Sequence, residues 1–133
     1  MVKEFVIAFT AKSTTVNEYL KDSQRHDQQA VKDMISFMDT NEDFLRKYKP
    51  IVCPLGVDES DANYLKAPRE NENRFELLLE YLRAHRDPPA TLEEIAVALQ
   101  NNGYKGFAKV IRMEDKRIQK MKQDQIPWDR VKS

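Results

Sequence analysis

The stretch FELLLEYLRAHRDPPATLEEIAVALQNNGYKGFAKVI, residues 75–111, carries the clearest apolar patterns and helix boundaries in the chain. Its first apolar residues recur at intervals of three and four, at Phe75, Leu78, Leu79 and Leu82. That spacing places their side chains on one face of an α-helix. Such a face has to pack against another element, which the rest of the stretch is expected to supply.

The boundaries of a second helix are marked on both sides. Thr91 and Glu94 have the spacing of a capping box, in which each side chain bonds to a backbone N–H of the first turn. Gly103 stands where a left-handed residue is expected to end the helix. Between these limits the apolar spacing repeats at Leu92, Ile95, Ala96 and Leu99. A third stripe follows at Phe107, Val110 and Ile111. Helices joined by such short connections are expected to pack together.

Residues 92–111 resemble the last two helices of death-fold domains, the superfamily that contains death domains and caspase-recruitment domains. In that superfamily a pattern of the form A-L-x-x-x-G-x-x-x-x-A-x-x-I/L ends the bundle. This chain matches the pattern at Ala98, Leu99, Gly103, Ala108 and Ile111. Tyr104 is similar to the recruitment-domain variant and residues 90–93 to the death-domain variant, so both subfamilies stay open. The similarity extends over residues 56–111, is weak over residues 30–55 and is absent elsewhere.

The composition favours the all-α class that the resemblance implies. Charged residues make up 33% of the chain, and it has only six prolines and three glycines. We therefore predict an antiparallel six-helix bundle of death-fold type over residues 26–111. An extra N-terminal segment, expected to be helical, occupies residues 1–25, although residues 5–9 alternatively fit a short strand. Residues 112–133 are expected to extend the last helix beyond the bundle and to end in a tail.

Further segments complete the predicted bundle. A further apolar stripe with helical spacing, which is expected to pack in the core, lies at Val31, Met34, Ile35 and Met38. Residues 39–43 begin like a calcium-binding loop, but Phe44 and Pro50 occupy positions that require glycine and a bidentate glutamate. A helix break is predicted there instead. Pro50 and Pro54 predict a loop or a single short turn, and residues 56–61 predict a turn and the acidic start of a short helix.

The sequence contains no recognisable catalytic or metal-binding pattern. His26 and His85 lack the spacing of metal ligands, and both are expected at the surface. Cys53, the only cysteine, has no neighbouring basic residue to activate it and is expected to be a buried structural thiol. A single cysteine suits a reducing compartment, so the cytoplasm, or alternatively the nucleus, is the expected location. We therefore predict a non-enzymatic protein without a cofactor, metal ion, small-molecule substrate or membrane partner.

Charge is unevenly distributed although the net charge is zero. Residues 1–57 carry eight acids and eight bases, residues 58–94 carry ten acids and five bases, and residues 95–133 carry four acids and nine bases. The net charges of these segments are therefore 0, −5 and +5. Complementary patches can join copies of a protein head to tail, and the resemblance implies assembly of this kind. The other interpretation is a solvated surface with an accidental charge distribution.

We therefore expect an adaptor domain that mediates homotypic assembly in apoptotic or innate immune signalling, as the resemblance implies. The expected partners are other death-fold domains or further copies of this chain. The candidate interface residues are acidic Asp58, Glu59, Asp61, Glu70 and Glu72 on one patch and basic Arg83, Arg86, Lys109 and Arg112 on another.

The alternative is a small helical regulatory subunit that docks through its C-terminal helix on a larger complex, including one that handles nucleic acid. Direct binding of nucleic acid by the chain itself is not expected. Glu114 and Asp115 interrupt the basic run over residues 109–122, and this run lacks interleaved aromatic residues.

Overall fold

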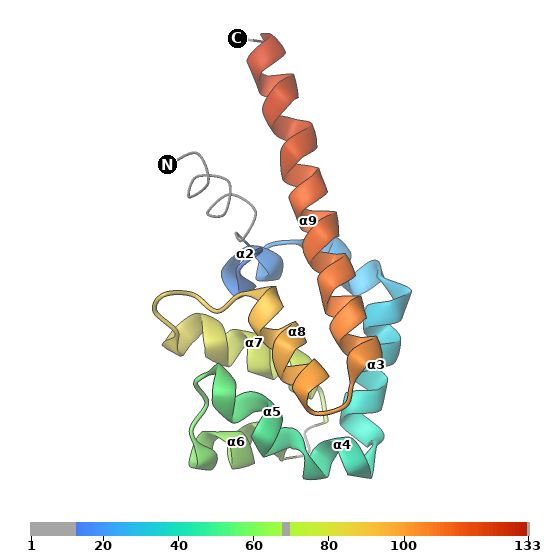
Figure 1. The fold of residues 1–133 in the computed structure, drawn as a ribbon, viewed down its shortest axis with the longest axis vertical. Helices are drawn as coiled ribbons and strands as arrows, with labels where there is room; N and C mark the ends of the chain where they lie inside the picture. Colours follow the sequence, from blue (N-terminus) through green and yellow to red (C-terminus); the bar gives the residue numbers. More distant parts are fainter. Residues whose placement is uncertain (1–12, 68–69, 133) are drawn as a thin grey trace.

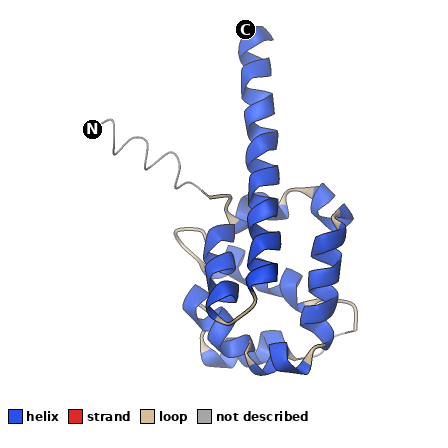
Figure 2. Ribbon diagram, turned by 45° about the vertical axis from the view of Figure 1, so that its right-hand side comes forward, coloured by secondary structure: helices blue, strands red, loops and turns tan. Residues whose placement is uncertain are grey.

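The computed structural model describes residues 13–67 and 70–132, with residues 125–132 described as helix backbone. Apart from one antiparallel bridge between Thr15 and Thr91, the regular structure of the described residues is helical (Figure 2). The elements are α2 (Val16–Leu20), the 3₁₀ helix η1 (Ser23–Asp27), α3 (Gln29–Thr40), α4 (Glu42–Arg46), α5 (Tyr48–Val52), the 3₁₀ helix η2 (Cys53–Leu55), α6 (Glu59–Lys66), α7 (Arg74–His85), α8 (Leu92–Asn101) and α9 (Lys105–Lys132). The predicted all-α class is therefore confirmed.

The helices form a bundle from which one long helix projects (Figure 1). α9 packs on α8 and α3, while α7 packs on α2, α3 and α6. α4, α5 and α6 close the end of the bundle opposite to the end from which α9 projects (Figure 1). α9 continues to Lys132, so the predicted extension of the last helix is confirmed. The predicted tail is wrong for the described residues, because the helix continues through Pro127 and Trp128. The helix or strand predicted at residues 5–9 lies outside the described residues.

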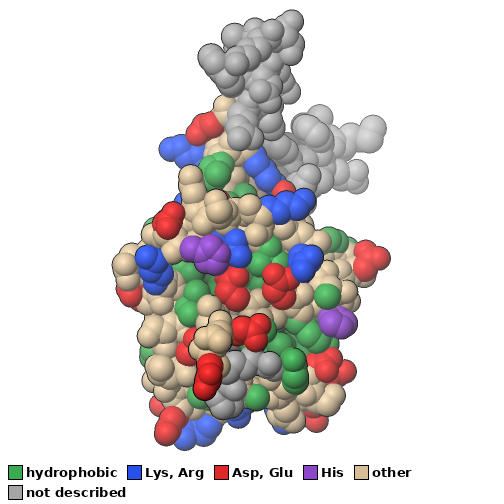
Figure 3. All heavy atoms as spheres, turned by 180° about the vertical axis from the view of Figure 1, so that it is seen from behind, with side chains coloured by type: hydrophobic (Ala, Val, Ile, Leu, Met, Phe, Trp, Pro, Cys, Tyr) green, Lys and Arg blue, Asp and Glu red, His purple; other side chains and the backbone are tan. Residues whose placement is uncertain are grey.

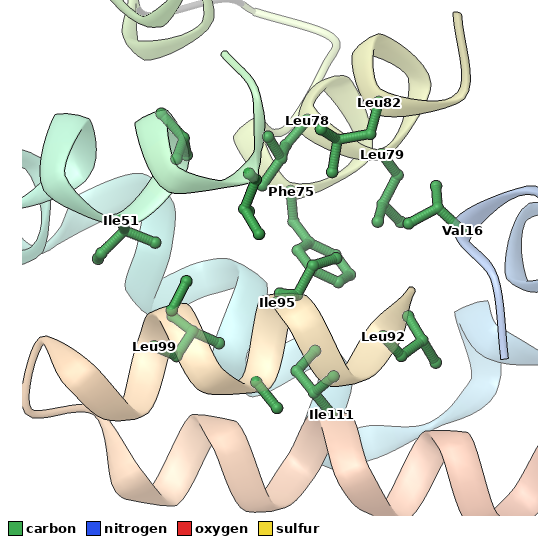
Figure 4. Packing of buried hydrophobic residues seen from close by; sticks show 14 of the residues in the cluster. Val16, Ile51, Phe75, Leu78, Leu79, Leu82, Leu92, Ile95, Leu99 and Ile111 are labelled. Carbon is green, nitrogen blue, oxygen red and sulfur yellow. The ribbon is translucent and has the colours of Figure 1, made fainter. Parts of the chain in front are cut away.

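The predicted apolar stripes meet in the core between α7, α8 and α9. Phe75 of α7 points toward Ile95 of α8, and Ile111 of α9 packs on the other side of α8 (Figure 4). The residues of the first two stripes and one residue of the third are buried, namely Phe75, Leu78, Leu79, Leu82, Leu92, Ile95, Ala96, Leu99 and Ile111. Phe107 and Val110 are half-buried and pack against this core. Burial of these apolar side chains is the main favourable contribution to folding.

The predicted ends of α8 are confirmed in atomic detail. The Glu94 N–H donates to Thr91 Oγ1 at 3.2 Å, and the Thr91 N–H donates to a carboxylate oxygen of Glu94 at 3.0 Å. Gly103 has a φ of 92°, the left-handed conformation that glycine adopts without steric penalty. The Tyr104 N–H then donates to the Leu99 carbonyl at 2.9 Å, which closes the turn between α8 and α9.

Residues 50–54 differ from the loop or single turn that was predicted for them. Pro50 is the third residue of α5, and Pro54 lies in η2. The first turn of a helix accommodates Pro50 because its N–H groups have no intrahelical acceptor. Cys53, between the two prolines, is half-buried rather than fully buried and packs against the core.

The core extends beyond residues 26–111 at both ends. Val16 and Tyr19 of α2 are 0% and 1% exposed, and Ile118 of α9 is 6% exposed in the same cluster. The Val16 N–H also donates to the Ala90 carbonyl at 2.8 Å. α2 and the first half of α9 are therefore part of the packed unit, because their side chains share its apolar interior.

Candidate interaction surface

The basic residues predicted for an interface do not form a single free patch. One guanidinium nitrogen of Arg86 donates to Glu94 at 3.0 Å, and another donates to the Leu55 carbonyl at 2.6 Å. Arg86 is thereby half-buried between α7, η2 and α8. Arg83 pairs with Glu80 on its own helix. Both arginines therefore have carboxylate partners within the chain.

The other two predicted basic residues differ from each other. Arg112 of α9 donates to Glu93 of α8 at 2.8 Å and to the Gln100 side chain at 2.7 Å, so it ties two helices together. The hydrogen bonds that Arg112 donates to Glu93 help to raise the pKa of this guanidinium above its usual value. Lys109 is exposed and has no ion pair among the described residues. Among the predicted basic residues, Lys109 is thus the one without an ion pair in the described part of the chain.

The predicted acidic residues on α6 lie together at its N-terminus. Asp58 caps the helix by accepting a hydrogen bond from the Asp61 N–H at 2.9 Å. The Asp61 carboxylate also accepts a hydrogen bond from the Tyr81 hydroxyl at 2.5 Å, which raises the pKa of Tyr81 to about 12. Glu59 is exposed, and Tyr64 on the same helix is 62% exposed. We call Asp58, Glu59, Asp61 and Tyr64 the α6 face.

The remaining predicted acids lie elsewhere. Glu70 and Glu72 belong to the connection between α6 and α7, where they line a hollow of about 480 Å³ with Asp39 and Arg74. α6 has eight residues, or about 12 Å, between its N-terminal acids and this connection. The predicted acidic patch is therefore divided in two. On the face seen in Figure 3, acidic and basic side chains are interspersed rather than separated by sign.

The outer face of α9 carries a row of lysines that the predicted site largely missed. We call Lys105, Lys109, Lys116 and Lys120 the lysine row. Their spacing of four, seven and four residues keeps them on one side of a helix over about 22 Å. All of them are exposed, and none has an ion pair among the described residues. Met113, in the middle of the row, is 59% exposed.

The acids that interrupt this basic run in the sequence are turned away from the outer face. Glu114 is 5% exposed and accepts a hydrogen bond from the Tyr19 hydroxyl at 2.7 Å. The Asp115 carboxylate accepts hydrogen bonds from the Ser13 hydroxyl at 2.5 Å and the Thr14 N–H at 2.9 Å. The run is thus interrupted in the sequence but not on the outer face.

A polar network fixes the inner face of α9 to the N-terminal part of the bundle. We call it the α2–α9 joint, formed by Tyr19, Asp22, Glu114, Asp115 and Arg117. Arg117 donates to Asp22 at 2.6 Å and to Glu114 at 3.0 Å. Burial, together with the hydrogen bond to Glu114, raises the pKa of the Tyr19 phenol well above its usual value. The hydrogen bond to Glu114 likewise raises the pKa of Arg117.

Helical periodicity was the signal that could have found the lysine row in the sequence. Glu114 follows the predicted core residue Ile111 by three positions, which places it on the buried side of a continuing helix. Lys109 and Lys116 are seven residues apart and fall on the opposite side. A count of charges along the sequence, without assignment to helix faces, does not show that the lysines and the acidic residues lie on different faces.

The two histidines lie at the surface and do not belong to a metal site within the described residues. His26 and His85 are exposed as predicted, and His85 stacks on Tyr81. Across residues 13–67 and 70–132, no group of histidine, cysteine and acidic residues is arranged to hold a metal ion. None of the helices within these ranges combines the length and the apolar character that crossing a bilayer requires.

No protein-family model, no curated protein and no solved structure matches this chain. We therefore infer its function from its own residues and surfaces.

Proposed function

We propose that this chain is a non-enzymatic protein–protein interaction domain, an adaptor that assembles with copies of itself or with other death-fold domains in apoptotic or innate immune signalling. The residue pattern that ends at Ile111 supports the family. The helix order adds support, because α3 to α9 provide six helical elements when the consecutive short helices α4 and α5 are taken as one. The proposed signalling pathway is inferred from the resemblance, since a fold by itself does not determine a function.

The lysine row is the observation that carries the assembly proposal. Lysines four residues apart on one helix repel each other by roughly 0.2–0.5 kcal/mol per pair. None of the lysines in this row forms an ion pair with a described residue that would offset the repulsion. A complementary acidic surface on another molecule supplies the missing negative charge. The α6 face has the opposite sign and, like the lysine row, contains a strongly exposed apolar side chain.

The two surfaces lie on different sides of the bundle. α6 packs on α5 and α7, whereas α9 packs on α8 and α3. A contact between the lysine row of one copy and the α6 face of the next is therefore heterologous, and repeated contacts of this kind build chains or rings rather than an isolated dimer. Met113 and Tyr64 supply apolar area at the centre of the contact, and the charges surround it.

Charge reversal with rescue tests this assembly. One variant carries Asp58→Asn and Glu59→Lys, in which asparagine preserves the helix cap, and the other carries Lys109→Glu and Lys116→Glu. Each variant alone is expected to lose self-association measured by sedimentation velocity, and an equimolar mixture is expected to regain it because the altered surfaces attract again. Lys32→Glu on α3, a matched reversal at another exposed lysine, should associate like the wild type.

Equal association of the wild type and both variants would remove the assembly proposal. Thermal melts of each variant by circular dichroism separate a lost contact from an unfolded domain.

The lysine row also favours the alternative, in which α9 docks on an acidic surface of a larger complex. Deleting residues 112–133 does not distinguish the two functions, because it removes Glu114 and Ile118 from the packed interior. Self-association of the intact chain at low salt does distinguish them. A chain that stays monomeric at all concentrations removes assembly and leaves docking.

A further inference from the structure

The methionines of α3 and α9 differ in how much of each side chain is open to solvent. Met34 and Met38 of α3 are 0% and 5% exposed and belong to the core. Met121 of α9 is 37% exposed, and Met113 on the outer face of the same helix is 59% exposed. A small oxidant dissolved in water therefore reaches the two methionines of α9 and is kept from those of α3.

The two exposed sulfur atoms also differ in their contacts. A guanidinium N–H of Arg117 donates a hydrogen bond to the Met121 sulfur at 3.8 Å. That bond engages a lone pair of the sulfur, which is the electron pair that an oxidant accepts. Among the described residues, none donates a hydrogen bond to the Met113 sulfur. Greater exposure and free lone pairs together make Met113 the more reactive of the two.

Met113 lies in the middle of the lysine row. It follows Lys109 by four positions and precedes Lys116 by three, so the three side chains are neighbours on one helix face. In the proposed assembly the apolar side chain of Met113 lies at the centre of the contact with the α6 face. A polar group at this point would have to lose its water when the contact forms, which costs free energy unless a hydrogen-bond partner replaces the water.

We propose that Met113 is an oxidation site, and that its conversion to methionine sulfoxide by hydrogen peroxide opens the contact between the lysine row and the α6 face. This regulation rests on the proposed assembly. The sulfur lone pair attacks one peroxide oxygen, so that an S–O bond forms and the O–O bond breaks. The hydroxide that leaves takes the proton from the new S–OH group and becomes water. The sulfur is thereby oxidised and the peroxide is reduced.

The product changes the surface of α9 and spares the core. Methionine sulfoxide is polar where the thioether is apolar, and methionine sulfoxide reductases convert it back. The Met113 side chain is largely in solvent, so its oxidation removes little packing from the bundle. The contact, once formed, covers Met113 and shields its sulfur from peroxide.

Peroxide treatment of the intact chain, with the oxidised residues identified by peptide mass spectrometry, tests the site. At about 0.5 M NaCl, where the contact is screened, Met113 is expected to gain oxygen before Met121, while Met34 and Met38 stay reduced. At about 0.05 M NaCl, assembly should slow the oxidation of Met113 and leave the rate at Met121 unchanged. Oxidation of Met121 ahead of Met113 at high salt would contradict the assignment.

Sedimentation velocity at low salt measures the effect on assembly. Oxidation of Met113 is expected to lower the association constant about tenfold, because the contact loses apolar area at its centre. Met113→Leu retains an apolar side chain of similar volume without sulfur, and it should associate like the wild type before and after peroxide. Met121→Leu is the matched control on the same helix and should still lose association on peroxide treatment.

The failure of the oxidation site and the failure of the assembly have different signatures. An assembled wild type whose association constant is unchanged after complete oxidation of Met113 would overturn the oxidation switch and leave the assembly standing. A wild type that is monomeric at low salt before peroxide is added would remove the assembly and its regulation together. Loss of the cooperative thermal melt after oxidation would also overturn the switch, because peroxide would then act on the fold rather than on the contact.

Discussion

Glu114 and Arg117 on the inner face of α9 have partners on α2 and just before η1, whereas Lys109 and Lys116 on the outer face have no ion pair among the described residues. The same helix thus carries two classes of charge. Inner charges are structural, because each one satisfies a buried group of the bundle. Outer charges are available to other molecules, because they form no ion pair among the described residues. This difference indicates which side of α9 can be changed without loss of the fold.

The largest expected effect comes from the apolar part of the inner face. Ile111→Ala removes a side chain that is 1% exposed and leaves a cavity between α8 and α9. A loss of about 2–5 kcal/mol in the free energy of unfolding is expected from urea titration. Met113→Ala, two residues away on the outer face, is the matched control and should change stability by less than about 0.5 kcal/mol. Similar losses for the two variants would mean that the faces of α9 are wrongly assigned.

The second-largest loss of stability is expected from a substitution in the α2–α9 joint. Glu114→Ala leaves the buried Tyr19 hydroxyl without its acceptor and removes one of the two carboxylates that bind Arg117. We expect a loss of about 2–3 kcal/mol, since Arg117 keeps its bond to Asp22. Glu114→Gln retains an acceptor and should lose less. If Glu114→Ala unfolds at the same urea concentration as the wild type, the joint does not hold α9 to α2.

A pH titration distinguishes the two faces in a different way. Burial raises the pKa of the Asp115 carboxyl, but hydrogen bonds from Ser13, Thr14 and Gln119 together outweigh burial and lower this pKa below its usual value of 3.8. Because this pKa is lower in the folded state, the ionised Asp115 carboxylate stabilises the fold above pH 3.8. That stabilisation is lost as the pH falls through the folded-state pKa. Thermal midpoints of Asp115→Asn should therefore depend less on pH below about 4 than those of the wild type.

An Asp115→Asn variant with the same acid dependence as the wild type would show that this carboxylate is not stabilised by the fold. Lys116→Gln is the control on the outer face, because Lys116 is exposed and forms no ion pair among the described residues.

The smallest effect on stability is expected for the lysine row. Lys109→Gln and Lys116→Gln remove positive charges that repel their neighbours at four-residue spacing and have no partner within the described residues. Together they should leave the free energy of unfolding unchanged or raise it by roughly 0.5 kcal/mol in urea titration. A clear loss of stability would show that these lysines have a structural role after all.

The separation into inner and outer faces also explains how much could be predicted from the sequence. The stripes of α7 and α8 and the left-handed Gly103 were predictable, because helical spacing and capping depend on residues a few positions apart. The pairing of Tyr19 with Glu114, 95 residues apart, was not predictable, since it depends on how α2 is placed against α9. Arg86 was assigned to a surface patch for the same reason, because its partner Leu55 is contributed by η2.

The candidate site was predictable only in part. Net charges of −5 and +5 over two segments indicated a bipolar chain, but they did not show which charges the fold neutralises. In the structure all described arginines form ion pairs, whereas the lysine row forms none within the described residues. The planar guanidinium suits such fixed internal pairs, while the flexible lysine side chain stays in solvent.

Static light scattering of the intact wild-type chain against salt concentration tests assembly through charge, because a contact between the lysine row and the α6 face is screened by ions. We expect an average molar mass well above that of the monomer at about 0.05 M NaCl and a fall toward the monomer value by about 0.5 M. A molar mass that stays constant over this range, whether monomeric or assembled, would contradict assembly through these charges.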